Sequence, residues 1–158
     1  MKTLLYAAFT MVVATTAVSQ AQTAKAGDQS PAKGQLIGAW QLVRIEAPGP
    51  DGKPLPIAQP NGMLIYTRDG HMSVQLMYPK SASASNNEYV QDGYEASFGS
   101  YDIDEATHTL THHVQGANTR DLLVGKDLPR VYQFTREGHL ILKSARAEEH
   151  WSVTWEHY

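Results

Sequence analysis

Short β-like runs separated by turn-forming residues constrain the fold of this chain more than any other feature. The runs are rich in β-branched and aromatic residues, and most are bounded by Gly, Pro, Asn, Asp or Ser, a pattern typical of strands. The predicted strands are residues 40–46, 62–67, 71–78, 96–103, 107–115, 130–135, 140–145 and 151–156. No segment shows helical periodicity over ten or more residues. The sequence therefore predicts a single all-β domain.

The connections between these strands favour an antiparallel barrel. Asp69-Gly70 joins the second and third strands and is a strong hairpin signal, so these strands are expected to pair antiparallel. Eight short strands form either a sandwich or a closed barrel, and a closed barrel leaves no edge exposed. Two connections are long: residues 79–91, with a short helix expected at 88–93, and residues 116–129. The Pro- and Gly-rich residues 48–54 are expected at the barrel rim.

The N-terminus has the features of a signal peptide. Lys2 precedes an apolar run that ends at Val18, and this run is shorter than the roughly 20 residues of a membrane-spanning helix. Ser19 and Ala21 place small residues at the positions that a signal peptidase requires. We therefore predict a signal peptide at residues 1–21, a flexible leader at residues 22–35 and a domain at residues 36–158. The mature protein is expected to be periplasmic or secreted.

Composition argues against several classes of partner. The formal net charge is −3 and no basic stripe is visible, which disfavours nucleic acid and anionic membrane surfaces. The chain contains no cysteine, so it forms no disulfide and carries no lipid-modified cysteine. Stable membrane anchoring is therefore not expected, and stability must come from the apolar core. Nothing in the sequence indicates the oligomeric state.

Several phrases, in their order along the chain, resemble the lipocalin-like domain family of bacteria and fungi. They are Gly38-Ala-Trp40 within residues 36–43, residues 62–77, 98–104 and 109–114, and Trp155-Glu156. The resemblance implies an antiparallel up-and-down barrel of about eight strands with a small cavity, closed at one end by Trp40. It implies no activity, because a fold does not fix a function. Two departures are His157, where the family commonly has Arg, and the Ser/Ala/Asn-rich composition of residues 79–91.

Three histidines near one another invite a metal hypothesis that the strand geometry does not support. His108 and His112 lie four residues apart, about 13 Å along a strand, and His112 and His113 point to opposite faces. A metal site would need His71 or another distant ligand, so no metal site is predicted. We expect instead that His112 shares a face with Leu110 while His113 takes the other, one of them making a hydrogen bond inside the barrel.

The chain also lacks the usual motifs for catalysis. It has no cysteine, no Gly-x-Ser-x-Gly elbow and no Gly-rich phosphate loop, so neither a catalytic nucleophile nor a cofactor is predicted. Asp102, Asp104 and Glu105 fall at a predicted strand end and turn, where Asp commonly bonds the backbone. Acid–base catalysis by Tyr, His and Arg inside the cavity, as an isomerase or cyclase requires, stays open as an alternative.

Candidate ligand-binding residues follow from strand alternation. Trp40, Leu42, Arg44 and Glu46 share one face of the first strand, which Trp40 would turn inward. Arg44 is then the leading polar contact, although it could instead pair with a carboxylate such as Glu46 or Glu156 and bind nothing. The full candidate set is Trp40, Arg44, Tyr66, Gln75, Tyr101, His113 and Tyr132. A register error of one residue would invert any of these assignments.

The sequence favours a binding or carrier protein for a small, mostly apolar or aromatic ligand held in the barrel. An isomerase-like or cyclase-like enzyme and a filled barrel with a structural role are the alternatives. The carrier and the enzyme require different cavities. A carrier needs apolar walls with few polar contacts, and an enzyme needs an acid–base pair converging on one point.

Overall fold

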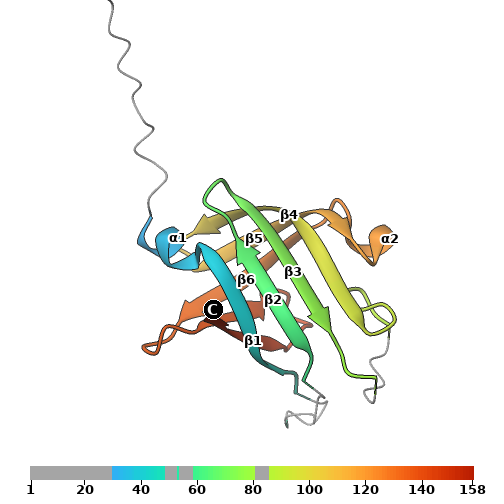
Figure 1. Ribbon diagram of the computed structural model, residues 1–158. Coiled ribbons are helices and arrows are strands. Elements are labelled where there is room, and N and C mark those ends of the chain that lie inside the picture. The colour runs from blue at the N-terminus through green and yellow to red at the C-terminus, as the bar shows by residue number, and fades with distance from the viewer. Residues whose placement is uncertain (1–29, 49–52, 54–58, 81–85) are drawn as a thin grey trace, which may run out of the picture.

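The chain forms a closed antiparallel barrel in which each strand pairs with its sequence neighbours and β1 pairs with β8 (Figure 1). This arrangement comes from a computed structural model that describes residues 30–48, 53, 59–80 and 86–158. The strands are β1 Gly38–Glu46, β2 Asn61–Tyr66, β3 His71–Met77, β4 Tyr94–Asp104, β5 Thr109–Ala117, β6 Asp127–Phe134, β7 Leu140–Ser144 and β8 Ser152–His157. The predicted fold class is confirmed.

Each strand lies within a few residues of its predicted position because the turn signals act locally. Gly70 adopts a φ of 88° at the β2–β3 hairpin, a conformation that glycine reaches without a steric penalty. The Thr67 hydroxyl donates to the carbonyl of His71 over 3.1 Å and accepts from its amide over 3.0 Å. The predicted antiparallel pairing of these two strands is therefore confirmed.

Two short helices lie at opposite ends of the barrel. Helix α1, Pro31–Leu36, begins at Ser30, whose hydroxyl accepts from the Lys33 amide over 3.1 Å. It packs against the barrel through Leu36, which is fully buried. The prediction that residues 22–35 lack regular structure is therefore wrong for 31–35. Helix α2, Arg120–Leu123, shortens the second long connection and buries Leu123.

The helix expected at residues 88–93 does not form. The side-chain oxygen of Asn87 accepts from the amides of Tyr89 and Val90 over 2.8 and 2.9 Å. Such local bonds stabilise a turn at the expense of a helix. The predicted signal peptide lies outside the described residues, as do residues 22–29 of the leader and most of the rim segment 48–54. Among the described residues, no helix is long and apolar enough to cross a membrane.

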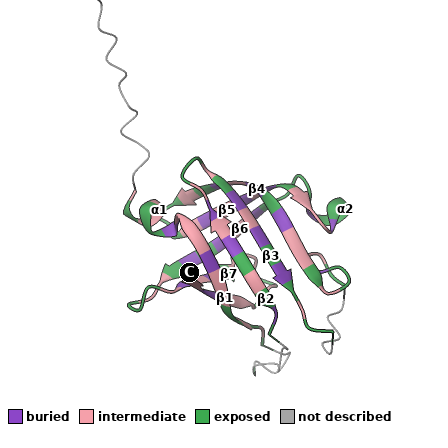
Figure 2. Cartoon of the chain, viewed as in Figure 1, coloured by how far each residue is buried: buried purple, intermediate pink, exposed green. Residues whose placement is uncertain are grey.

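Buried and exposed residues alternate along the strands, as a barrel requires (Figure 2). Trp40 is 1% exposed and donates its indole N–H to the Leu36 carbonyl over 2.9 Å. The His157 ring stacks on Trp40 at 3.5 Å between ring centroids. A Cβ at Gly38 would lie 2.7 Å from that ring, and Gly38 has a φ of 141°. The glycine of the Gly-x-Trp phrase thus makes room for His157.

Candidate functional site

The barrel contains a cavity of about 280 Å³ at the end away from α1. Its mouth is formed by residues from the β1–β2, β3–β4 and β7–β8 connections, including Ala47, Asn87 and Trp151. Its walls are largely apolar and are made by Ile45, Leu64, Val74, Leu76, Leu128, Leu142, Val153 and Trp155. The volume is just below the roughly 300–1,000 Å³ typical of ligand pockets, so a small molecule fits best.

A buried hydrogen bond lies in the cavity wall. The Tyr66 hydroxyl and Nε2 of His112 are 2.6 Å apart, and both side chains are buried. Burial, assisted by the positive charge of Arg130, lowers the pKa of His112 to about 3. Burial raises the pKa of Tyr66 well above its usual range. At neutral pH both groups are therefore uncharged, and the tyrosine can donate to the imidazole.

Two ionisable side chains of opposite sign line the same cavity. Arg130 on β6 is 5% exposed, an unusual environment for a guanidinium. Glu95 on β4 has its pKa raised from 4.5 to about 7 by burial, although the positive charge of Arg130 opposes that shift. Near neutral pH Glu95 is therefore only partly ionised.

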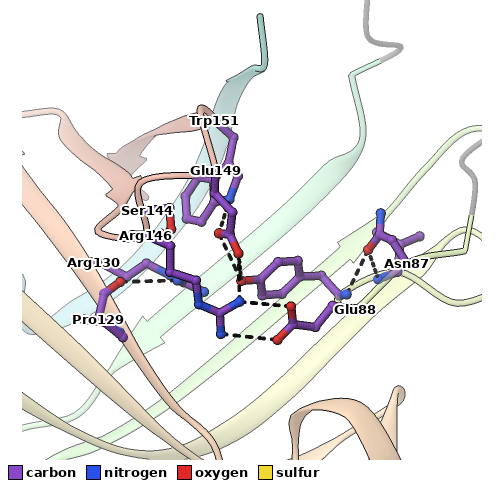
Figure 3. A network of polar contacts seen from close by, with 10 residues as sticks. Asn87, Glu88, Pro129, Arg130, Ser144, Arg146, Glu149 and Trp151 are labelled. Atoms are coloured by element: carbon purple, nitrogen blue, oxygen red, sulfur yellow. Dashed lines mark hydrogen bonds and ion pairs between the residues drawn. The ribbon is translucent and has the colours of Figure 1, made fainter. Parts of the chain in front are cut away.

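The mouth of the cavity is held by a polar network (Figure 3). A guanidinium nitrogen of Arg146 lies 2.9 Å from a Glu88 carboxylate oxygen and 2.8 Å from one of Glu149. Glu149 also accepts from the Tyr89 hydroxyl over 3.2 Å and from the Trp151 indole over 2.9 Å. These contacts tie residues 88–89 to the β7–β8 connection, across the entrance to the barrel.

Arg130 lies between the two aromatic side chains of this network. Its guanidinium carbon is 4.8 Å from the Trp151 ring and 5.5 Å from the centroid of the Tyr89 ring. Cation–π contacts of this length stabilise a buried cation without neutralising its charge. The mouth therefore presents a positive charge held in a fixed position by aromatic rings.

A sequence model of the lipocalin-like domain family matches residues 37–157. This chain belongs to that family. The match spans the whole barrel described above, so the resemblance found in the sequence is confirmed.

The lipocalin-like barrel also has distant neighbours among solved structures. A redesigned beta barrel shares 11% identity, covering 80% of this chain and 95% of that one with a TM-score of 0.44. Wild-type fluorescent protein UnaG shares 10% identity, covering 79% of this chain and 98% of that one with a TM-score of 0.41. A search of curated proteins found no match.

Arg44 lies outside the lipocalin-like cavity, and its predicted inward orientation is wrong. The β1–β8 register shifts between Leu42 and Arg44, so the alternation that starts at Trp40 reverses there. Ile45 consequently lines the cavity. Arg44 is exposed and its Nε lies 3.3 Å from a Glu46 carboxylate oxygen, which is the alternative that the sequence left open.

Gln75 and His113 also face outward, so the predicted register of each strand was wrong by one residue. Gln75 is exposed, between Val74 and Leu76, which line the cavity. His113 lies on the outer surface, 2.7 Å from an Asp127 oxygen and 3.0 Å from an Asp102 oxygen. Its pKa is raised, chiefly by the hydrogen bond to Asp127. His112 is the inward residue, and its bond to Tyr66 confirms the expected hydrogen bond inside the barrel.

The remaining candidates are buried but do not line the cavity. Tyr66 bonds His112 but does not itself line the cavity, and Tyr101 donates its hydroxyl to the Thr67 carbonyl over 2.9 Å. Tyr132 packs with Phe134 at the closed end, beside Trp40. None of the seven candidate residues lines the cavity. Within the described residues, no group of three or more His, Cys, Asp or Glu is placed to hold a metal ion.

The sequence analysis missed Arg130, Glu95, Tyr89 and Trp151. Arg130 could have been found, because Leu128, Arg130 and Tyr132 share one face of β6 and that face is otherwise apolar. Tyr89 and Trp151 precede their nearest strands and reach the site only through the folded connections. No local pattern places such residues.

Proposed function

We propose that this lipocalin-like protein is an exported binding protein that holds one small, mostly apolar molecule in the barrel. The observation that carries the proposal is the cavity of about 280 Å³, whose walls are mostly aliphatic and aromatic. Transfer of apolar ligand surface from water to such walls is favourable by about 25 cal/mol per Å². The few polar groups in the walls would orient the molecule.

Export is the second part of the proposal and depends on the sequence of the first 21 residues. The charged start, the apolar run and the small residues Ser19 and Ala21 support removal of this segment during secretion. Expression of the full chain in a bacterial host should give periplasmic protein that begins at Gln22, as measured by intact mass. Unprocessed protein confined to the cytoplasm would contradict the export proposal.

Native mass spectrometry tests ligand binding most simply. The protein purified from the exported fraction should have a native mass that exceeds its denatured mass by that of a small organic molecule. The neutral dye N-phenyl-1-naphthylamine should bind the delipidated protein with increased fluorescence. A bare native mass together with no dye binding would contradict the proposal and favour a barrel with a structural role.

The enzyme alternative stays a prediction. Its most specific support is Glu95, because an acid whose pKa is about 7 is suited to exchange protons at neutral pH. The buried side chains of Tyr66 and His112 are hydrogen-bonded to each other, so this pair supports the enzyme alternative less specifically than Glu95 does. Chemical change of the molecule released from the protein, seen by mass spectrometry, would support the enzyme over the carrier.

A further inference from the structure

Arg130 is the only Lys or Arg among the described residues that line the cavity. Its guanidinium donates over 3.3 Å to the carbonyl of the preceding residue, Pro129, and it also makes a hydrogen bond with the Tyr89 side chain. A guanidinium has five N–H donors, and burying them without acceptors is costly. Neither partner is an anion, so these contacts do not neutralise the charge of Arg130.

The charge of Arg130 is not matched by a protein carboxylate. Arg130 takes part in none of the ion pairs found among the described residues, whereas Arg44 and Arg146 each have a carboxylate within 4.0 Å. Glu95 lines the same cavity, but its pKa of about 7 leaves it partly protonated at neutral pH. Arg130 can therefore pair with an anionic group of a ligand that enters the cavity.

An unsatisfied donor lines the same cavity. Trp155 is 2% exposed, and its indole N–H has no hydrogen-bond acceptor in the described structure. The Trp155 indole and the Arg130 guanidinium both carry N–H donors, so the polar groups of a ligand that suit this cavity are acceptors. A carboxylate or a similar oxyanion supplies acceptors and negative charge together.

We propose that Arg130 is the anchor for an anionic group, and that the ligand is a small amphiphile with an apolar body and one carboxylate-like head. This inference rests on the proposed binding function and specifies its ligand class. The head pairs with Arg130 near Tyr89 and Trp151 at the mouth. The apolar body extends into the barrel against wall residues such as Leu64 and Leu142.

The rings beside Arg130 make it a suitable anchor. Trp151 and Tyr89 hold the guanidinium between them, which limits its rotamers before the ligand arrives. A preorganised group loses less entropy when it binds. The indole of Trp151 is itself fixed by its bond to Glu149, so the anchor is supported by the mouth network.

Decanoate and decanol form a matched pair of probes, because they share a ten-carbon skeleton and differ in the charge of the head. Each is titrated into delipidated protein loaded with N-phenyl-1-naphthylamine, below its aggregation concentration, and dye displacement gives its affinity. Wild-type protein should bind decanoate at least about tenfold more tightly than decanol, because only the carboxylate forms charge-assisted hydrogen bonds with Arg130.

Arg130→Met removes the charge and keeps much of the side-chain volume. It should weaken decanoate binding by about tenfold or more while decanol binding changes by less than about twofold. Arg130→Lys should retain part of the preference, since it keeps the charge without the planar donors. Arg44→Gln is the matched control. It removes an exposed barrel arginine that is paired with Glu46, and it should leave the affinities for decanoate and decanol unchanged.

The outcomes separate this inference from the proposed function. Equal binding of decanoate and decanol by wild-type protein would overturn the anion anchor while leaving a carrier of neutral molecules. Failure of the dye and both probes to bind would contradict the binding function itself. If Arg130→Met does not fold, the wild-type preference and its reduction in Arg130→Lys remain the deciding measurements.

Discussion

The two ends of the barrel use the same eight strands in different ways. At the α1 end, the fully buried Leu36 and Leu140 pack around Trp40, whose indole N–H is bonded to a backbone carbonyl. At the other end, the strands enclose a cavity, and the buried Arg130 has no carboxylate partner among the described residues. The first end is complete without a ligand, and the second is not.

This difference separates residues that stabilise the fold from residues that bind. Side chains at the closed end contribute through dense packing, where truncation leaves a void. Side chains at the open end leave a cavity between them and present to it a positive charge that has no carboxylate partner among the described residues. Mutations at the closed end should therefore reduce stability first, and mutations at the open end should change binding first.

The largest expected effect is on stability at the closed end. Trp40→Ala should lower the free energy of unfolding by about 3–5 kcal/mol, because it leaves a large void beneath α1. Trp151→Ala at the mouth is the matched comparison, since Trp151 is only partly buried. Urea denaturation of the ligand-free proteins measures both. An equal decrease in the free energy of unfolding for Trp151→Ala and Trp40→Ala would contradict the proposed difference between the two ends.

The next effect concerns pH at the open end. Because the pKa of Glu95 is about 7, this carboxyl ionises as the pH rises from 6 to 8 and then competes with a ligand carboxylate for Arg130. Decanoate affinity should therefore fall by up to about tenfold over this range, while decanol affinity stays constant. Glu95→Gln should abolish the pH dependence, as measured by dye displacement at each pH.

Other groups facing Glu95 do not titrate in this window. The pKa of His112 is about 3 and that of Tyr78 is about 12, in both cases chiefly through burial. The free energy of unfolding should also decrease as the pH rises, because the folded protein holds the Glu95 proton more tightly than the unfolded chain does. This contribution is present below pH 4.5 and is lost as the pH rises through about 7. A decanoate response that persists in Glu95→Gln would assign the pH effect to another group.

A smaller effect is expected at the mouth network. Arg146→Gln removes the ion pairs with Glu88 and Glu149, which are partly exposed and should contribute no more than about 1 kcal/mol. Loosening of this contact should speed decanoate dissociation by up to about fivefold, as measured by stopped-flow displacement at low salt. High salt should reduce the difference from wild type. Identical dissociation rates would show that the network does not restrict the entrance.

Much of the fold could be predicted from the sequence, because strand alternation and turn chemistry are local. Asp69-Gly70 forms the turn between two adjacent strands, and the Trp40 indole bonds the carbonyl of Leu36 four residues earlier. The site was not predictable in the same way. The β-bulge near Arg44 reverses the alternation of β1 without a mark in the sequence, and the cavity mouth brings together Tyr89, Arg130 and Trp151 from three distant segments.

The central claim is that the open end, and not the closed end, holds an apolar ligand with an anionic head. Methyl-resolved NMR during a decanoate titration tests it directly, because Leu and Val methyl groups report from both ends. The account predicts large shift changes at cavity residues Val74, Leu76 and Val153, and little change at Leu36 and Leu140. Equal changes at both ends, or changes confined to the outer surface, would contradict it.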